Sequence, residues 1–272
     1  MRSNKYFRII KRIAKPLFYY ISNPKKILAS ESIGITVDGL KHFCVYENHI
    51  ERSILEKGIW ESNETAATKK ILKSDWVVFD IGANIGYFTL LMSKLVGKNG
   101  YVYCFEPTTY GYNRLKKNIR LNPEFLLHNI VVNKKGLSSC TENKIEALES
   151  RFSARLLAHS EKELIEFITL DDYVASKNIQ KVDFIKIDVD GYDYEVIKGG
   201  CKILKKFRPI VMAEICNRVL NERGVNVVSY LELYLQYGYN SCEILESNEL
   251  MTILELIRDS RIQSGSWNIL LS

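Results

Sequence analysis

The hydrophobic residues of this chain form short continuous runs that alternate with stretches of helical spacing. The first clear run occupies 76–79 and ends at Asp80, and apolar residues then recur every three or four positions from Ile85. A continuous apolar run predicts a strand covered on both faces, whereas the second spacing predicts an amphipathic helix. We therefore expect a strand over 76–81, a tight turn, and a helix over about 85–96.

The same alternation continues along the chain and predicts a mostly parallel sheet, because strands joined through helices run in the same direction. The further strands are expected at 101–105, 129–133, 182–187, 209–214, 239–244 and 267–271. The further helices are expected at about 109–121, 192–206 and 226–237. Residues 137–166 are polar and are expected to be mostly helical or irregular.

The pattern divides the chain into three parts. Residues 1–30 form a basic amphipathic segment, residues 31–60 a short β-rich appendage, and residues 61–272 the main α/β domain. Alternating apolar residues predict the strands of the appendage. A helix over 61–73, with Asn63 as its N-cap, is expected to open the main domain.

The segment 1–30 contains eight basic residues and no acidic one. Its apolar residues recur at helical spacing, Pro16 interrupts the pattern, and no apolar run is long enough to span a membrane. We hypothesise a peripheral helix on an anionic membrane face, in a cytoplasmic protein that contacts the inner face of the membrane. A helix that docks on the protein's own domain is the alternative, and a mitochondrial presequence ranks third.

Charge and composition argue against two classes of function. The whole chain has a formal net charge of +6, so the part after the basic segment carries −2. A nucleic-acid enzyme would more often carry its basic residues around the cleft, and no nucleic-acid partner is expected. The six cysteines show no metal-binding spacing and the four histidines are scattered, so we expect reduced thiols and no metal site.

The turn after the first strand has the form DxGxNxG, with Asp80, Gly82, Asn84 and Gly86 at the fixed positions. Glycine permits a sharp bend, Asn tolerates positive φ, and Gly86 is expected to let the new helix pack against its strand. The dinucleotide fingerprint GxGxxG holds a pyrophosphate, but the leading Asp80 would repel an anion. It would attract an amino group or a sulfonium, so the turn favours S-adenosylmethionine (SAM).

Acidic residues follow four of the expected strands, and ligands of open α/β sheets lie beyond the carboxyl ends of the strands. Glu106 follows the second strand and could accept hydrogen bonds from both hydroxyls of an adenosine ribose. A helix cap is its alternative role. The other acids at strand ends are Asp80, Asp188 with Asp190, and Glu214.

Four motifs, in the order DIGANIGYFTL, VYCFEP, TLDD and FIKIDVDGYDYEVIKGG, resemble the FkbM family of SAM-dependent methyltransferases. The likeness covers about residues 58–215 and includes a Gly-x-Trp-Glu element that ends at Glu61. It implies the class I methyltransferase fold, a Rossmann-like, mostly parallel seven-stranded sheet with helices on both faces. The implied strand order is 3-2-1-4-5-7-6, with the seventh strand antiparallel.

The resemblance also implies the roles of individual residues. The turn residues Asp80, Gly82, Asn84 and Gly86 would border the methionine part of SAM, and Glu106 would hold its ribose. Glu61 could reach the cofactor from the appendage, although a surface position in the first turn of a helix is the plainer alternative.

Methyl transfer to a hydroxyl benefits from a base near the acceptor oxygen. Asp188 is expected to face the reaction centre, Asp190 is the second catalytic candidate, and Asp193 and Tyr192 are expected to hold the acceptor. The family usually has Glu where this chain has Asp190 and Asp193, so both carboxylates have a shorter reach. The alternatives are that the acids cap the following helix and that Tyr192 packs inside the fold.

The leading prediction is a SAM-dependent methyltransferase that methylates a hydroxyl of a sugar, a polysaccharide or a related secondary metabolite. One alternative is a catalytically silent scaffold of the same fold at the membrane, and another is a nicotinamide-dependent oxidoreductase. The acceptor surface is expected to come from residues 137–166 and the two ends of the chain.

Overall fold

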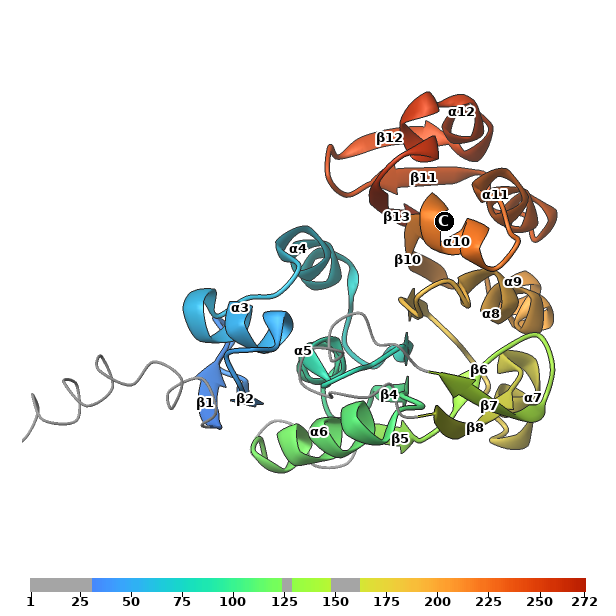
Figure 1. Cartoon of the computed structure of the whole chain (residues 1–272). Helices are drawn as coiled ribbons and strands as arrows, with labels where there is room; N and C mark the ends of the chain where they lie inside the picture. The colour runs from blue at the N-terminus through green and yellow to red at the C-terminus, as the bar shows by residue number, and fades with distance from the viewer. Residues whose placement is uncertain (1–30, 124–128, 148–161) are drawn as a thin grey trace, which may run out of the picture.

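The computed structural model describes residues 31–123, 129–147 and 162–272, and an eight-stranded sheet forms its centre (Figure 1). The strands follow one another in the order β12-β11-β13-β10-β9-β3-β4-β5. In that order their bounds are Glu249–Thr252, Ser241–Ile244, Ser266–Leu271, Ile210–Cys216, Phe184–Ile187, Val77–Ile81, Tyr101–Phe105 and Ile130–Asn133.

The connectivity of this sheet confirms the predicted class I methyltransferase fold. Neighbouring strands from β5 to β10 pair in parallel, and β13 runs antiparallel to both β10 and β11. The seven expected strands therefore have the implied order with an antiparallel seventh strand. One strand of this sheet was not predicted. It is β12, which pairs antiparallel with β11 and adds an eighth strand.

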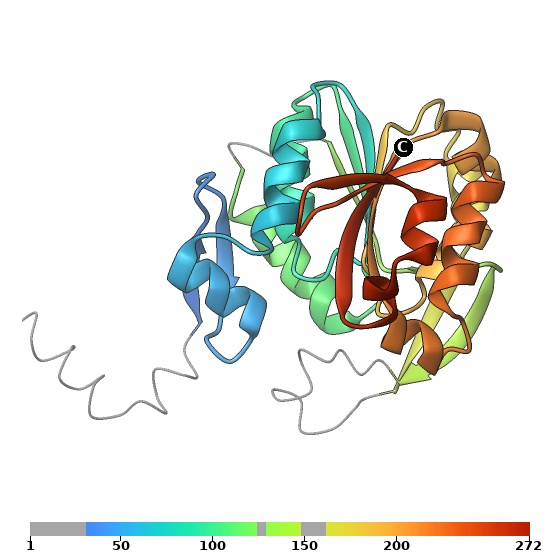
Figure 2. The same cartoon turned by 90° about the horizontal axis from the view of Figure 1, so that it is seen from above.

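Helices cover both faces of the sheet, as the view from above shows (Figure 2). Val78 and Phe184 pack into a cluster that contains α5, whereas Phe79 and Ile185 pack into one that contains α8 and α11. Successive strand residues thus serve opposite cores, which explains the continuous apolar runs. The helices of the main domain are α4 (Ser62–Ile71), α5 (Tyr87–Val96), α6 (Thr109–Arg120), α7 (Leu170–Ser176), α8 (Asp193–Gly199), α9 (Cys201–Phe207), α10 (Asn217–Glu222), α11 (Val227–Gln236), α12 (Ile253–Arg258) and the 3-10 helix η1 (Ser260–Gln263).

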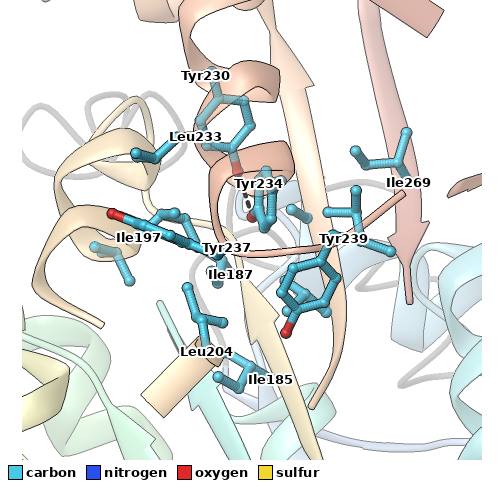
Figure 3. Close-up of a cluster of buried hydrophobic side chains, with 14 of the residues drawn as sticks. Ile185, Ile187, Ile197, Leu204, Tyr230, Leu233, Tyr234, Tyr237, Tyr239 and Ile269 are labelled. Atoms are coloured by element: carbon cyan, nitrogen blue, oxygen red, sulfur yellow. Dashed lines mark hydrogen bonds between the residues drawn. The ribbon is translucent and has the colours of Figure 1, made fainter. Parts of the chain in front are cut away.

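Buried tyrosines close the core between α11 and the sheet (Figure 3). Tyr230 and Tyr234 lie one turn apart on α11, and their hydroxyl oxygens are 3.1 Å apart. The Tyr239 hydroxyl donates to the Pro209 carbonyl oxygen at 2.7 Å. These bonds satisfy polar groups that would otherwise be costly to bury, so the rings can fill the core beside β9 and β10.

The strands β1 (Ser32–Ile35) and β2 (Lys41–Cys44) form an antiparallel hairpin next to α3 (His49–Lys57) and α6. Two asparagines, Asn118 of α6 and Asn122 just after this helix, satisfy the outer edge of β2. The side chain of Asn122 accepts from the Lys41 N–H at 2.7 Å and donates to the Lys41 carbonyl at 2.8 Å, while Asn118 accepts from the Phe43 N–H at 2.8 Å. Side chains thus occupy the place of a further strand.

Two element predictions near the N-terminus are wrong. Residues 49–57, expected within short strands, form α3, whose N-cap Asn48 accepts from the N–H groups of Ile50 and Glu51. Asn63 is not the N-cap of α4, because that position belongs to Glu61, which makes no capping bond with its side chain.

The prediction for 137–166 is also wrong where the structure describes it. A separate three-stranded sheet has the order β6-β8-β7, with bounds Gly136–Leu137, Lys162–Ile168 and Glu142–Ala147. In β8, Ile165 and Phe167 are buried while Leu164 is largely exposed. Charged residues on its open face hid this strand from the hydrophobic pattern.

Within 31–123, 129–147 and 162–272, no helix is both long and apolar enough to cross a membrane. The segment 1–30, for which membrane contact is predicted, lies outside these ranges. The division into three parts at residues 30 and 60 stays a prediction.

Candidate cofactor and acceptor site

The glycine turn joins the end of β3 to the start of α5 and folds against the ends of two neighbouring strands. The N–H groups of Gly82 and Ala83 both donate to the Phe105 carbonyl at the end of β4, at 3.0 and 2.9 Å. Gly82 has φ +88°, and a Cβ there would lie 1.8 Å from the Asp188 carbonyl oxygen. Only glycine fits, because the turn passes directly over the end of β9.

Asn84 and Gly86 complete the turn with positive φ values of 49° and 88°. The expectation that Gly86 serves packing against its own strand is wrong, since an added Cβ would lie 2.3 Å from the Leu115 side chain of α6. Gly86 therefore lets α6 approach the turn. Helix α6 also contacts Glu106, through its N-cap Thr108 and through Gly111.

Glu106 lies beside the turn at the end of β4 and is almost fully buried. One carboxylate oxygen accepts from the Asn84 N–H at 2.9 Å, and the other accepts from the Thr108 N–H at 2.9 Å and from its hydroxyl. Thr108, not Glu106, is the N-cap of α6. Burial raises the pKa of Glu106, and these hydrogen bonds oppose the rise.

Asp80 and Lys186 lie opposite each other on the neighbouring strands β3 and β9. The Thr89 hydroxyl of α5 donates to Asp80, and the Lys186 ammonium lies 4.6 Å from the centroid of the Phe88 ring. Burial raises the pKa of Asp80, an effect that Lys186 opposes. Burial alone would lower the pKa of Lys186, but Asp188, Glu61 and Asp80 hold it above its ordinary value.

The segment after β9 brings three aspartates to the edge of the sheet. Lys186 donates to Asp188 at 2.8 Å, and about a third of the Asp188 side chain is exposed. Asp190 is exposed and has φ +48°. Asp193 begins α8, where one carboxylate oxygen accepts from the Gly191 N–H at 3.0 Å. Burial, reinforced by Asp188, raises the pKa of Asp193 to about 7.

Glu61 approaches the same edge from the start of α4, in the left-handed conformation with φ +42°. Burial raises its pKa to about 8, with Lys186 opposing and Asp188, Glu64 and Glu214 adding to the rise. Glu61 is therefore not a freely solvated surface acid. The structure brings it together with Asp188 across more than a hundred residues of sequence.

The Tyr192 side chain packs against Phe167 and Arg223. Its ring stacks on Phe167 of β8 at a centroid distance of 5.3 Å, and the Arg223 guanidinium carbon lies 3.6 Å from its centroid. The predicted acceptor residue Tyr192 is thus fixed beside Asp193 by contacts from two other elements.

Sequence reasoning missed three residues of this region. Glu64 shares the charged cluster with Glu61, Thr89 holds Asp80, and Gly111 lies so close to Glu106 that a Cβ would be 2.7 Å from the carboxyl carbon. The separation of Glu64 from Glu61 by three residues on a helix was a readable signal. No sequence pattern indicated the roles of Thr89 and Gly111, because both roles depend on how a helix packs.

Beyond the end of β10, a surface depression is lined by Asn217, Arg218, Asn221 and Glu222 of α10 and by residues 263–265. Within the described ranges, no group of three or more His, Cys, Asp or Glu residues has an arrangement that could hold a metal ion.

Known methyltransferases are similar to parts of this chain. It is 25% identical over 164 residues to the hexuronic acid methyltransferase AglP of Haloferax volcanii, a match that covers 57% of this chain and 65% of that protein, slightly less than two thirds of its length. It is 25% identical over 199 residues to methyltransferase sdnD of Sordaria araneosa, with 61% and 74% covered. The solved FkbM methyltransferase of Methylobacillus flagellatus KT aligns with a TM-score of 0.48 at 16% identity, over 75% of this chain and 45% of that one.

A family model described as the methyltransferase FkbM domain matches residues 80–241, more than half of the chain. The matched region contains the glycine turn, Glu106 and the aspartates after β9. The resemblance predicted from the motifs is confirmed, and this chain belongs to the FkbM methyltransferase family.

Proposed function

We propose that this protein is a SAM-dependent methyltransferase that methylates a hydroxyl oxygen of a sugar, a polysaccharide or a related secondary metabolite. The observation that supports it most is the contact of Glu106 with the N–H of Asn84. Through this bond, the acid at the end of β4 is tied to the glycine turn at the end of β3. Membership of the FkbM family adds to it.

The residues present suit SAM. The glycines at 82, 86 and 111 let the turn, α6 and Glu106 approach one another closely, because a Cβ at each would clash with protein atoms, and carboxylates suit a cofactor with a sulfonium and an amino group. Glu106 would hold the ribose hydroxyls, while Asp80, Asn84 and the turn would border the methionine part, with Glu61 above them. When bound, SAM supplies an electrophilic methyl group.

The chain's own contribution is to align the acceptor and to take up its proton. In this proposal Asp188 is the base: Lys186 occupies one of its oxygens, and the exposed part of the side chain faces solvent where an acceptor can arrive. Asp190, Asp193 and Tyr192 would hold the acceptor. The amide side chain of Asn221 in the depression offers further hydrogen bonds of the kind that sugar hydroxyls accept and donate.

The oxygen-directed reaction and the sugar acceptor draw on the relatives as well. AglP is named a hexuronic acid methyltransferase and sdnD a methyltransferase, each at 25% identity. Both names are compatible with a polyhydroxylated acceptor for this chain.

The experiment that tests the proposal follows release of S-adenosylhomocysteine from SAM with a panel of mono- and disaccharides, and locates the methyl group in the product by NMR. We expect a methyl ether, and we expect Asp188→Asn to lower kcat by about 10²–10⁴ with little change in the KM for SAM. Glu249→Gln on the distant strand β12 is the matched control. A methyl group on nitrogen or carbon, or normal turnover by Asp188→Asn, would contradict the mechanism.

A further inference from the structure

We propose that this site selects an acceptor that carries an amine, ahead of a neutral sugar and well ahead of one that carries a carboxylate. The inference rests on the proposed function and specifies the charge of the acceptor beside its reacting hydroxyl.

Carboxylates from four elements gather at the edge where the acceptor must arrive. Glu61 interacts electrostatically with Asp188, Glu64 and Glu214, and Asp193 interacts with Asp188 and Glu214. The strands deliver two of these groups, while α4 and α8 deliver the rest. Charges of one sign in a partly enclosed site attract ligands of the opposite sign and repel ligands of the same sign.

The cation inside this cluster is already engaged. Lys186 is 4% exposed, donates to Asp188 at 2.8 Å and lies over the Phe88 ring. An acceptor carboxylate would find this buried ammonium shielded and already neutralised by Asp188, whereas an acceptor amine would meet the remaining acids.

Asp193 gives an independent sign that a positive group is missing. Its side chain is 5% exposed, and its second carboxylate oxygen has no hydrogen-bond partner among the described residues. The charged groups that act on it, Asp188 and Glu214, are both negative, and the Tyr230 and Tyr234 hydroxyls of α11 bond to each other. A buried carboxylate without a donor is unfavourable, and a nearby ammonium would relieve it.

Arg223 is the rival feature, because its guanidinium lies at the rim over Tyr192 and could bind a carboxylate. Stacking on Tyr192 fixes the group but leaves it exposed. Selection of an amine by the acids and selection of a carboxylate by Arg223 predict opposite rankings of acceptors, so acceptors that differ only in charge distinguish them.

Proton release gives a second readout. Glu61 has its pKa raised to about 8 by burial, with Lys186 opposing and Asp188, Glu64 and Glu214 adding to it. The pKa of Asp193 is raised to about 7 by burial and by Asp188 and Glu214. Both groups hold part of their protons at pH 7, so a cationic ligand that favours the charged carboxylates must release protons on binding. Its affinity should therefore rise between pH 6.5 and 8, and a carboxylate ligand should show the reverse.

The experiment uses the full chain saturated with S-adenosylhomocysteine and three methyl glucosides that differ at carbon 6, which bears an amino group, bears a hydroxyl group or is oxidised to a carboxylate. Calorimetry in buffers of different ionisation enthalpy gives affinity and proton release, and SAM turnover gives kcat/KM. We expect the amine to exceed the neutral sugar by about tenfold and the carboxylate by about a hundredfold at low salt, with protons released. Glu214→Gln should reduce the advantage of the amine, whereas Arg223→Gln should leave the ranking unchanged.

The inference would be overturned if the carboxylate sugar bound as well as the amine, if all three sugars bound equally, or if none of them bound. If S-adenosylhomocysteine itself fails to bind, the proposed function falls and the inference falls with it. If it binds and the ranking fails, only the inference is lost.

Discussion

At the scale of single residues, the candidate site depends on two close approaches between backbone and side chains. The end of β9 leaves no room for a side chain at residue 82, and Glu106 leaves none at residue 111. These two glycines fix the distance between the turn and the acid, and that distance decides whether a ribose and a methionine tail can be held together.

We predict that Gly82→Ala lowers the free energy of unfolding by about 2–4 kcal/mol and abolishes SAM binding, because the new Cβ would lie 1.8 Å from the Asp188 carbonyl oxygen. Gly39→Ala is the matched control, since Gly39 also has positive φ but has nothing within 4 Å of the new Cβ. It should cost only about 1 kcal/mol. Urea denaturation of both variants measures the difference. Equal decreases in the free energy of unfolding would show that the backbone at the end of β9 can shift to make room for the new Cβ.

The raised pKa values of buried acids predict how stability depends on pH. Glu61 and Asp193 titrate near 8 and 7 in the folded protein, above the ordinary values of 4.5 and 3.8. The folded state therefore binds more protons than the unfolded state, and the free energy of unfolding should fall as pH rises from 6 to 8, by about 3–4 kcal/mol in total.

Glu61→Gln and Asp193→Asn should each flatten this slope in denaturation curves recorded at several pH values. Glu249→Gln should not, because Arg261 lowers the pKa of Glu249 and moves its titration out of this range. A slope that is unchanged in the first two variants would show that these acids are charged and solvated in the folded protein.

At the scale of elements, α6 connects the appendage to the turn. Asn118 is fully buried: its side-chain oxygen accepts from the Phe43 N–H of β2, and its amide nitrogen donates to the Ile85 carbonyl at 2.8 Å. Arg114 on the same helix pairs with the buried Glu51 of α3 at 3.1 Å. Movement of the appendage would therefore be transmitted to the turn through one side chain.

Two variants, one in α6 and one just after it, separate docking of the hairpin from cofactor binding. Asn118→Leu should lower the free energy of unfolding by about 2–4 kcal/mol, because it leaves two buried backbone groups without partners, and it should also weaken SAM binding. Asn122→Leu removes the bonds to Lys41 and one to the Asn118 carbonyl but none to the turn, so it should destabilise the hairpin with SAM affinity unchanged. Equal effects of both variants on SAM affinity would argue that Asn118 has no special link to the turn.

The elements that could be predicted from sequence are those buried on both faces. β3, β4 and β10 contain continuous apolar runs, β9 is apolar apart from Lys186, and the order of these strands follows from the family likeness. By contrast, β8 exposes one face, and its mixture of acids and aliphatic residues gave no clear period. Helix α3 was hidden because the alternation of the preceding strands was extended too far, although Asn48 and the spacing of Ile50 and Ile54 indicate a helix start.

For the site, strand ends were predictable and helix packing was not. Acids at the carboxyl ends of parallel strands meet because the sheet brings them to one edge, which placed Asp80, Asp188 and Glu214 in one region. The contribution of Glu64, and the Thr89 contact to Asp80, depend on the rotation of α4 and α5 about their axes. A single sequence constrains that rotation only loosely.

At the scale of the whole molecule, charge is divided along the chain. Eight basic residues precede Glu31, and the remainder has a net charge of −2. We predict that the full chain co-sediments with anionic liposomes at low salt, and that a variant lacking residues 1–30 does not, because basic residues contribute about 1 kcal/mol each near an anionic surface. Equal sedimentation of both proteins would contradict membrane contact through this segment.

The roles proposed for this site all require that the turn after β3 and Glu106 hold SAM. Calorimetric titration of the full chain with SAM and with S-adenosylhomocysteine, alongside Glu106→Ala and the control Glu249→Ala, tests it most directly. We expect micromolar binding to the wild type and the control, and a loss of at least about tenfold in Glu106→Ala, as expected for a carboxylate that accepts two ribose hydroxyls. No binding to the wild type, or equal binding to Glu106→Ala, would contradict this role of the turn and Glu106, and titration with NADH would then test the oxidoreductase alternative.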